Sequence, residues 1–128
     1  MVFAPGAPVI LRVGERNHEL DRLLRRHGWR DWAFITAWNP RSHPLPAWRN
    51  DYRQRRLARL FPLALVGAGI GEDPDWPGEE SLCVLGLSAG RARRIARLFG
   101  QNAIVAGTRG GAARLIWCDA GMLGGLIP

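Results

Sequence analysis

Lysine is absent from this chain: all 18 basic residues are arginine, and against 11 acidic residues they give a formal net charge of +7. Because the planar guanidinium group matches the oxygens of phosphates and carboxylates, this excess predicts an acidic protein, an acidic ligand or nucleic acid as partner. A GC-rich genome, which replaces lysine with arginine and enriches Ala, Gly, Pro and Trp, explains the same composition without any partner. Composition alone leaves both explanations open.

Long apolar runs are missing too, since no stretch approaches the roughly 20 residues that a membrane helix needs. The opening MVFAPGAPV lacks the basic start and long apolar stretch of a signal peptide. We therefore expect a soluble cytoplasmic protein with no membrane partner. Cysteine is scarce: Cys83 and Cys118 each lie in an apolar run without a CxxC neighbour, so we expect two buried free thiols.

No histidine follows His43, which bears on the GLSAG string at Gly86–Gly90. This string matches the G-x-S-x-G elbow of hydrolases, in which an acid and a histidine follow the serine. Here Ser88 is followed by one acid, Asp119, and by no histidine, so we expect it to be a helix N-cap. The acidic loop Glu72–Glu80 lacks EF-hand spacing and could instead lie over the arginines. We expect no metal site and no cofactor.

The 128 residues, 47% of them apolar, fit a single domain with one core. Hydrophobic patterns and turn residues predict strands at 9–13, 32–38, 63–66, 81–87, 103–106 and 114–118, and helices at 17–28, 48–61 and 88–99. This order mixes crossovers with hairpins. It predicts a single α+β domain with a mixed or antiparallel sheet of about five to six strands and three helices packed on it. Residues 1–8 are expected to be a flexible start and 119–128 a C-terminal tail.

Arginine is concentrated on the second and third expected helices. The second carries Arg49, Arg53, Arg55, Arg56 and Arg59, and the third carries Arg91, Arg93, Arg94 and Arg97. We predict an anion-binding or nucleic-acid-binding surface made by Arg53, Arg56, Arg93 and Arg97. The alternative is a solvated face on each helix. Trp29, Trp32, Trp38 and Trp48 lie nearby in sequence and could stack bases, although such residues usually fill cores.

The strings AFITAWNPRS (Ala33–Ser42) and LFGQNAIVAG (Leu98–Gly107), with DWPGEESLCVLGLS between them, resemble the bacterial family called "domain of unknown function 3293". The resemblance covers roughly residues 9–118. It implies no activity, substrate or cofactor. It does imply the positions of recurring polar residues, which are here Thr36, Asn39, Asn50, Glu80, Ser81 and Gln101.

Several of these polar residues lie at the ends of expected strands, where a rigid scaffold commonly displays binding groups, although turn chemistry also explains them. Two functions stay open. The first is a small binding or adaptor domain for an acidic partner, with nucleic acid as one candidate. The second is a small enzyme or ligand-binding protein with a pocket built from Asn39, Asn50, Glu80 and Gln101. In the second, Glu80 would be the general base. We favour binding, because the set lacks a nucleophile.

Overall fold

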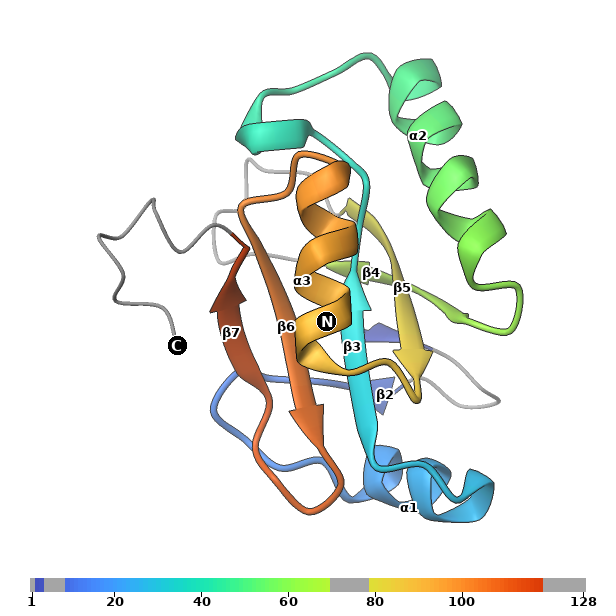
Figure 1. Cartoon of the computed structure of the whole chain (residues 1–128), viewed down its shortest axis with the longest axis vertical. Helices are drawn as coiled ribbons and strands as arrows, with labels where there is room; N and C mark the ends of the chain where they lie inside the picture. The colour runs from blue at the N-terminus through green and yellow to red at the C-terminus, as the bar shows by residue number, and fades with distance from the viewer. Residues whose placement is uncertain (1, 4–8, 70–78, 119–128) are drawn as a thin grey trace.

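The strands of this chain form one sheet in the order β2-β1-β4-β5-β3-β6-β7, and every named pair of neighbours is antiparallel (Figure 1). The structure, a computed structural model, describes residues 2–3, 9–69 and 79–118. The strand bounds are β1 Val2–Phe3, β2 Val9–Ile10, β3 Asp31–Ile35, β4 Leu65–Gly69, β5 Glu79–Leu85, β6 Ala103–Thr108 and β7 Arg114–Trp117.

Three α-helices connect these strands, α1 His18–His27, α2 Ala47–Leu60 and α3 Ala89–Leu98, together with a short 3-10 helix, η1 Pro40–Ser42. Local chemistry sets the helix ends. The Asn17 side chain accepts from the Leu20 N–H at 2.9 Å, and α1 stops at Gly28, which has a φ of 71°. The Ser88 side chain accepts from the Arg91 N–H at 3.3 Å, which confirms it as the N-cap of α3.

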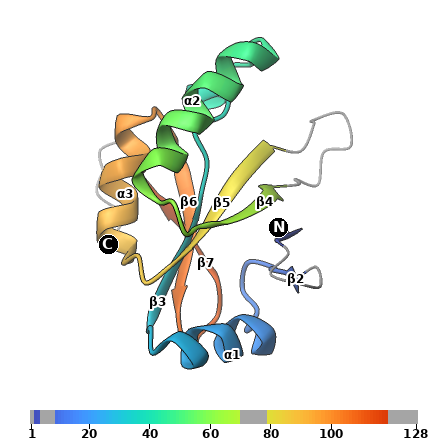
Figure 2. The ribbon, with the colours of Figure 1, turned by 90° about the vertical axis from the view of Figure 1, so that its right-hand side faces the viewer.

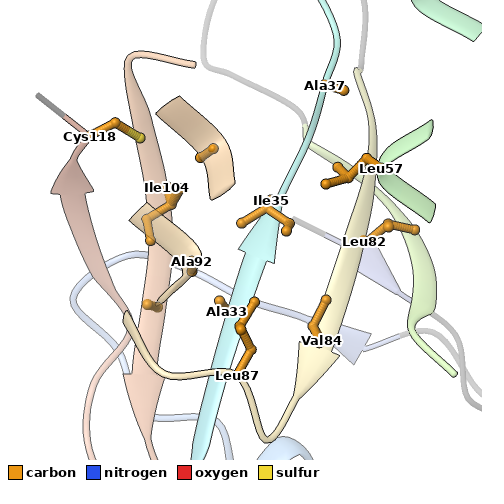
Figure 3. Packing of buried hydrophobic residues seen from close by; sticks show 12 residues of the cluster. Ala33, Ile35, Ala37, Leu57, Leu82, Val84, Leu87, Ala92, Ile104 and Cys118 are labelled. Carbon is orange, nitrogen blue, oxygen red and sulfur yellow. The ribbon is translucent and has the colours of Figure 1, made fainter. Parts of the chain in front are cut away.

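The two faces of the sheet carry separate apolar layers, because side chains alternate along each strand. Ala33 and Ile35 of β3 face α2 and α3, whereas Trp32 and Phe34 face α1 and the β2 segment. Figure 2 shows α2 and α3 on the same side of the sheet. In Figure 3, Ile35 of β3 lies between Ile104 of β6 and Leu82 of β5, within the layer that α2 and α3 cover. The two arginine-rich helices therefore share one face of the molecule.

The α+β class, the antiparallel sheet and the three helices confirm the sequence prediction. Several boundaries differ, among them those of β3 and β4, which were expected at 32–38 and 63–66. The expected strand 9–13 shortens to β2, and Val13 instead forms an isolated parallel bridge with Ala113. The expected flexible start includes Val2–Phe3, which pairs with both β2 and β4. Residues 4–8 and the expected tail at 119–128 lie outside the described residues.

Both cysteines are free and buried, as expected. Burial raises the pKa of the Cys83 thiol to about 12. Burial also raises the pKa of Cys118 to about 11, although Arg93 and Arg97 act in the opposite direction. The native protein therefore keeps both thiols protonated at a pH where an unfolded chain ionises them.

This difference predicts that alkali destabilises the fold. Below pH 9 both states hold the thiol protons, so the contribution to stability is complete there. Above that pH only the unfolded state loses them, and the free energy of unfolding should fall by about 1.4 kcal/mol per pH unit for each thiol. Urea denaturation of the parent and of Cys83→Ala between about pH 8 and 10.5 measures this. The prediction is wrong if the variant, whatever its own stability, shows the same pH slope as the parent.

Candidate functional site

The chain from Thr36 to Leu45 leaves the sheet after β3, and side chains from α2 hold it in place. Asn50 makes the largest contribution. Its Oδ1 accepts from the Asn39 N–H at 2.9 Å, and its Nδ2 donates to Asn39 Oδ1 at 2.8 Å and to the Leu45 carbonyl at 3.2 Å. Because Asn39 and Asn50 are only 6% and 2% exposed, these bonds replace water that cannot reach the groups. We call residues 36–45 with their partners the polar corner.

Gln54, one turn after Asn50, holds the start of the polar corner. Its Oε1 accepts from the Ala37 N–H at 2.9 Å, and the Thr36 hydroxyl donates to the Glu80 carbonyl at 2.6 Å. The bond to Ala37 fixes the amide orientation, since the reverse orientation would place two donors against each other. Among the residues that the structure describes, Gln54 Nε2 is then a buried donor without a hydrogen-bond partner, and Trp38 Nε1 is another.

Two further side chains tie the polar corner to the end of α3. Arg53 Nε donates to the Ala37 carbonyl at 2.9 Å, and Arg53 Nη2 donates to the Phe99 carbonyl. Gln101 Nε2 donates to the Trp38 carbonyl at 2.9 Å. Phe99 is the C-cap of α3, and the last carbonyls of a helix have no N–H donor within the helix. Arg53 therefore supplies a donor to a carbonyl at the end of α3. The polar corner thus joins β3, α2 and α3.

Burial lowers the pKa of Arg53 below its ordinary value, and the positive charges of Arg49 and Arg56 lower it further. The three guanidinium groups therefore repel one another, while Arg53 is engaged by backbone carbonyls. This geometry gives Arg53 a structural task beside the anion binding that the sequence predicts.

Backbone strain is concentrated in the same place. Asn39, Arg41 and Ser42 have φ values of 42°, 53° and 60°, in the left-handed region that side chains disfavour. Gly100 packs so closely that a Cβ on it would lie 2.9 Å from Pro40 Cβ. Such strain persists only where surrounding contacts determine the conformation, and the bonds from Asn50 and Gln101 supply them.

The structure thus brings four of the six predicted ligand-binding residues, Thr36, Asn39, Asn50 and Gln101, to one segment, where they bond to the backbone or to one another. Glu80 contributes its carbonyl, and its side chain is exposed. Ser81 is buried on the α1 face and donates to the Glu79 carbonyl at 3.0 Å. A pocket shared by these side chains stays a prediction.

Sequence reasoning missed Gln54. The available signal was its spacing, because Asn50, Gln54 and Leu57 recur at i, i+4 and i+7, which is one face of a helix. All three are buried. A helix face with two amides and one leucine does not match the apolar stripe expected of a helix that packs on a core. Its burial becomes evident only when the groups that the two amides bond are known.

The opposite side of α2 combines aromatic and basic residues. All of its members are exposed: Trp48, Arg49, Tyr52, Arg55, Arg56 and Arg59. We call this set the α2 outer face. Trp48 is 70% exposed and Tyr52 is 55% exposed, so neither fills the core. The Arg49 guanidinium lies 6.0 Å from the centre of the Trp48 ring, and that of Arg56 lies 6.0 Å from the centre of the Tyr52 ring.

Helix α3 adds Arg91, Arg94 and Arg97 as exposed arginines on the same side of the sheet. Arg93, predicted to belong to the outward surface, is instead half-buried and lines a groove of about 370 Å³ between α3 and β7, together with Arg114 and Trp117. Because Arg93 lines this groove, it does not belong to the exposed outer side of α3.

Acidic partners for the exposed arginines of α2 and α3 are lacking in the described part of the chain. Within residues 2–3, 9–69 and 79–118, no exposed arginine of α2 or α3 has a carboxylate within 4 Å. Arg16 and Asp21, on the other side of the sheet, do form an ion pair, at 3.8 Å. The idea that loop Glu72–Glu80 covers the arginines concerns mostly residues 70–78, outside the described part.

Among the described helices, none is long and apolar enough to cross a membrane. Within the same residues, no group of three or more His, Cys, Asp or Glu side chains could hold a metal ion.

Comparison with known proteins gives one match. A family model described as "Protein of unknown function (DUF3293)" matches residues 35–104, more than half of the chain. The matched region includes the polar corner and helices α2 and α3. No curated protein and no solved structure matches the chain.

Proposed function

Because the chain belongs to the DUF3293 family, whose description assigns no activity, we propose a function from the geometry of α2 and α3: the domain binds nucleic acid through their exposed arginines. One observation carries the proposal. Seven exposed arginines, Arg49, Arg55, Arg56, Arg59, Arg91, Arg94 and Arg97, lie on two helices that cover the same face of the sheet, and none is ion-paired within the described residues.

Two features of this arrangement are electrostatically unfavourable in the free domain. Arg49 lies in the first turn of α2, which has no acid, and the helix dipole disfavours a cation there. Arg55 and Arg59 are one turn apart and repel each other by a few tenths of a kcal/mol, roughly 0.2–0.5. A row of phosphates would offset both terms, because each contact neutralises a charge and releases counterions.

The polar corner supports the alternative, an enzyme or ligand pocket with Glu80 as base, less well. The amides of Asn39, Asn50 and Gln101 already hold backbone groups or each other. A ligand that used these amides would have to break bonds that shape the loop.

The charge proposal predicts a steep salt dependence. If four arginines contact phosphates, the slope of log Kobs against log salt should be about −2.8 on single strands and about −3.6 on duplex. Replacing Arg55, Arg56 and Arg59 together with Gln should make the single-strand slope shallower by about 2. Fluorescence anisotropy with labelled oligonucleotides from about 20 to 200 mM salt measures both values.

Helix α1 provides a control with the same change in net charge. Arg22, Arg25 and Arg26 are also exposed, but α1 packs on the other face of the sheet. Their joint replacement with Gln should leave the slope unchanged. Equal losses in the two triple variants, or no binding by the parent at low salt, would overturn the proposal.

A further inference from the structure

The two exposed aromatic rings of the α2 outer face go beyond what a purely electrostatic surface needs. We infer that Trp48 and Tyr52 are a stacking platform that makes the domain select unpaired bases, so that its ligand is single-stranded nucleic acid bound without sequence preference. This inference rests on the proposed function and specifies its ligand. Exposure is the first observation, because Trp32 is 2% exposed in the core whereas Trp48 is 70% exposed.

The position of the rings on α2 is the second observation. Trp48 and Tyr52 are four residues apart, so they lie side by side on the helix, about 6 Å apart along its axis. Stacked bases in a duplex strand repeat every 3.4 Å or so, and their faces are covered by neighbouring bases. Unpaired bases can splay out and stack on aromatic rings one at a time. The spacing therefore suits two bases of an extended strand.

Charge surrounds the rings on both sides. Arg49 and Arg56 each place a guanidinium 6.0 Å from a ring centre, and Arg55 and Arg59 continue the same helix side. A strand whose bases stack on the rings would bring its phosphates beside these arginines. Aromatic rings within a basic groove or row are how proteins hold single strands.

The amides that could read a base sequence point elsewhere. Asn and Gln recognise adenine through bidentate bonds in the major groove. On α2 these residues are Asn50 and Gln54, which are 2% and 4% exposed and bond to the polar corner. The outer face therefore offers stacking and charge without an amide to read adenine. Stacking on aromatic rings tolerates any base, which predicts sequence-tolerant binding.

The test separates bases from phosphates. We would measure binding of the full chain to a labelled 20-nucleotide oligo(dT), to an abasic strand of the same length, to a 20-base-pair duplex and to polyglutamate. The parent should bind oligo(dT) at least about tenfold more tightly than the abasic strand, because stacking strengthens binding about 5- to 160-fold per base. Trp48→Ala with Tyr52→Ala should remove this difference and leave abasic binding unchanged.

Two further variants serve as controls. Trp48→Phe with Tyr52→Phe keeps a ring at each position and should retain the preference for bases. Leu60→Ala with Leu63→Ala removes other exposed apolar side chains, 54% and 87% exposed, and should change neither affinity. Because all four positions are exposed, folding should persist, and urea denaturation checks it.

Each result decides a different point. Duplex binding as tight as oligo(dT) binding, or equal losses on oligo(dT) and abasic strands in the double alanine variant, would overturn the stacking inference and leave the charge proposal standing. Polyglutamate binding that matches oligo(dT) and depends on Trp48 would instead identify an acidic protein surface as the partner, because Trp, Tyr and Arg also dominate protein interfaces. No binding to any polyanion would overturn both proposals.

Discussion

Replacing Asn50 with alanine is expected to lower the free energy of unfolding by about 3 kcal/mol, because it removes three hydrogen bonds from a largely buried loop, although Asn39 Oδ1 keeps the Leu45 N–H as a donor at 3.0 Å. The lost bonds are those to the Asn39 N–H, to Asn39 Oδ1 and to the Leu45 carbonyl. Asn39 is itself 6% exposed, so water cannot replace them without rearranging the loop. Urea denaturation followed by circular dichroism measures the change.

The neighbouring residue provides the control. Asp51 lies on the same turn of α2 but is exposed, and Asp51→Ala should change stability by no more than about 0.5 kcal/mol. An Asn50→Ala protein as stable as the parent would contradict the structural role of the polar corner. That result would favour the ligand-binding role that the sequence predicts for Asn50.

Arg53→Gln is expected to cost about 2 kcal/mol of stability, since a hydrogen bond from a charged group contributes about 1.5–3 kcal/mol. The guanidinium of Arg53 bonds to the carbonyls of Ala37 and Phe99, which belong to different elements. A glutamine is too short to reach both. The same variant should leave the salt dependence of oligo(dT) binding unchanged, because the guanidinium is already engaged.

Arg55→Gln should do the reverse. It removes the same charge two residues further along α2, from an exposed position. Stability should stay within about 0.5 kcal/mol, while the salt slope on single strands should become shallower by about 0.7. If Arg53→Gln instead reduces the slope without loss of stability, Arg53 is an anion ligand and the structural interpretation is wrong.

Much of the fold could be predicted, because it depends on neighbours in sequence. Asn17 and Ser88 were identified as caps from the residues that follow them, and the antiparallel sheet from short apolar runs joined by turns. The expected strand at 32–38 was too long for a non-local reason. Gln54, far along the chain, bonds to the Ala37 N–H, and β3 therefore ends at Ile35.

The candidate site was predictable in part. Position in the chain indicated which polar residues gather at the ends of strands, but it could not show what each side chain bonds. Asn50 and Gln101 were predicted to bind a ligand, and in the structure both bond to the polar corner. Their partners, which are backbone groups and the side chain of Asn39, belong to another segment, and no local pattern reveals them.

The sequence by itself determined the α+β class, the helix caps, the free thiols and the concentration of arginine on α2 and α3. Only the tertiary structure decided which side of α2 meets the protein. Both sides carry polar and apolar residues, so hydrophobic periodicity could not orient the helix. Packing against β5 turned Asn50 and Gln54 inward, and this rotation left Trp48 and Tyr52 exposed beside the arginines.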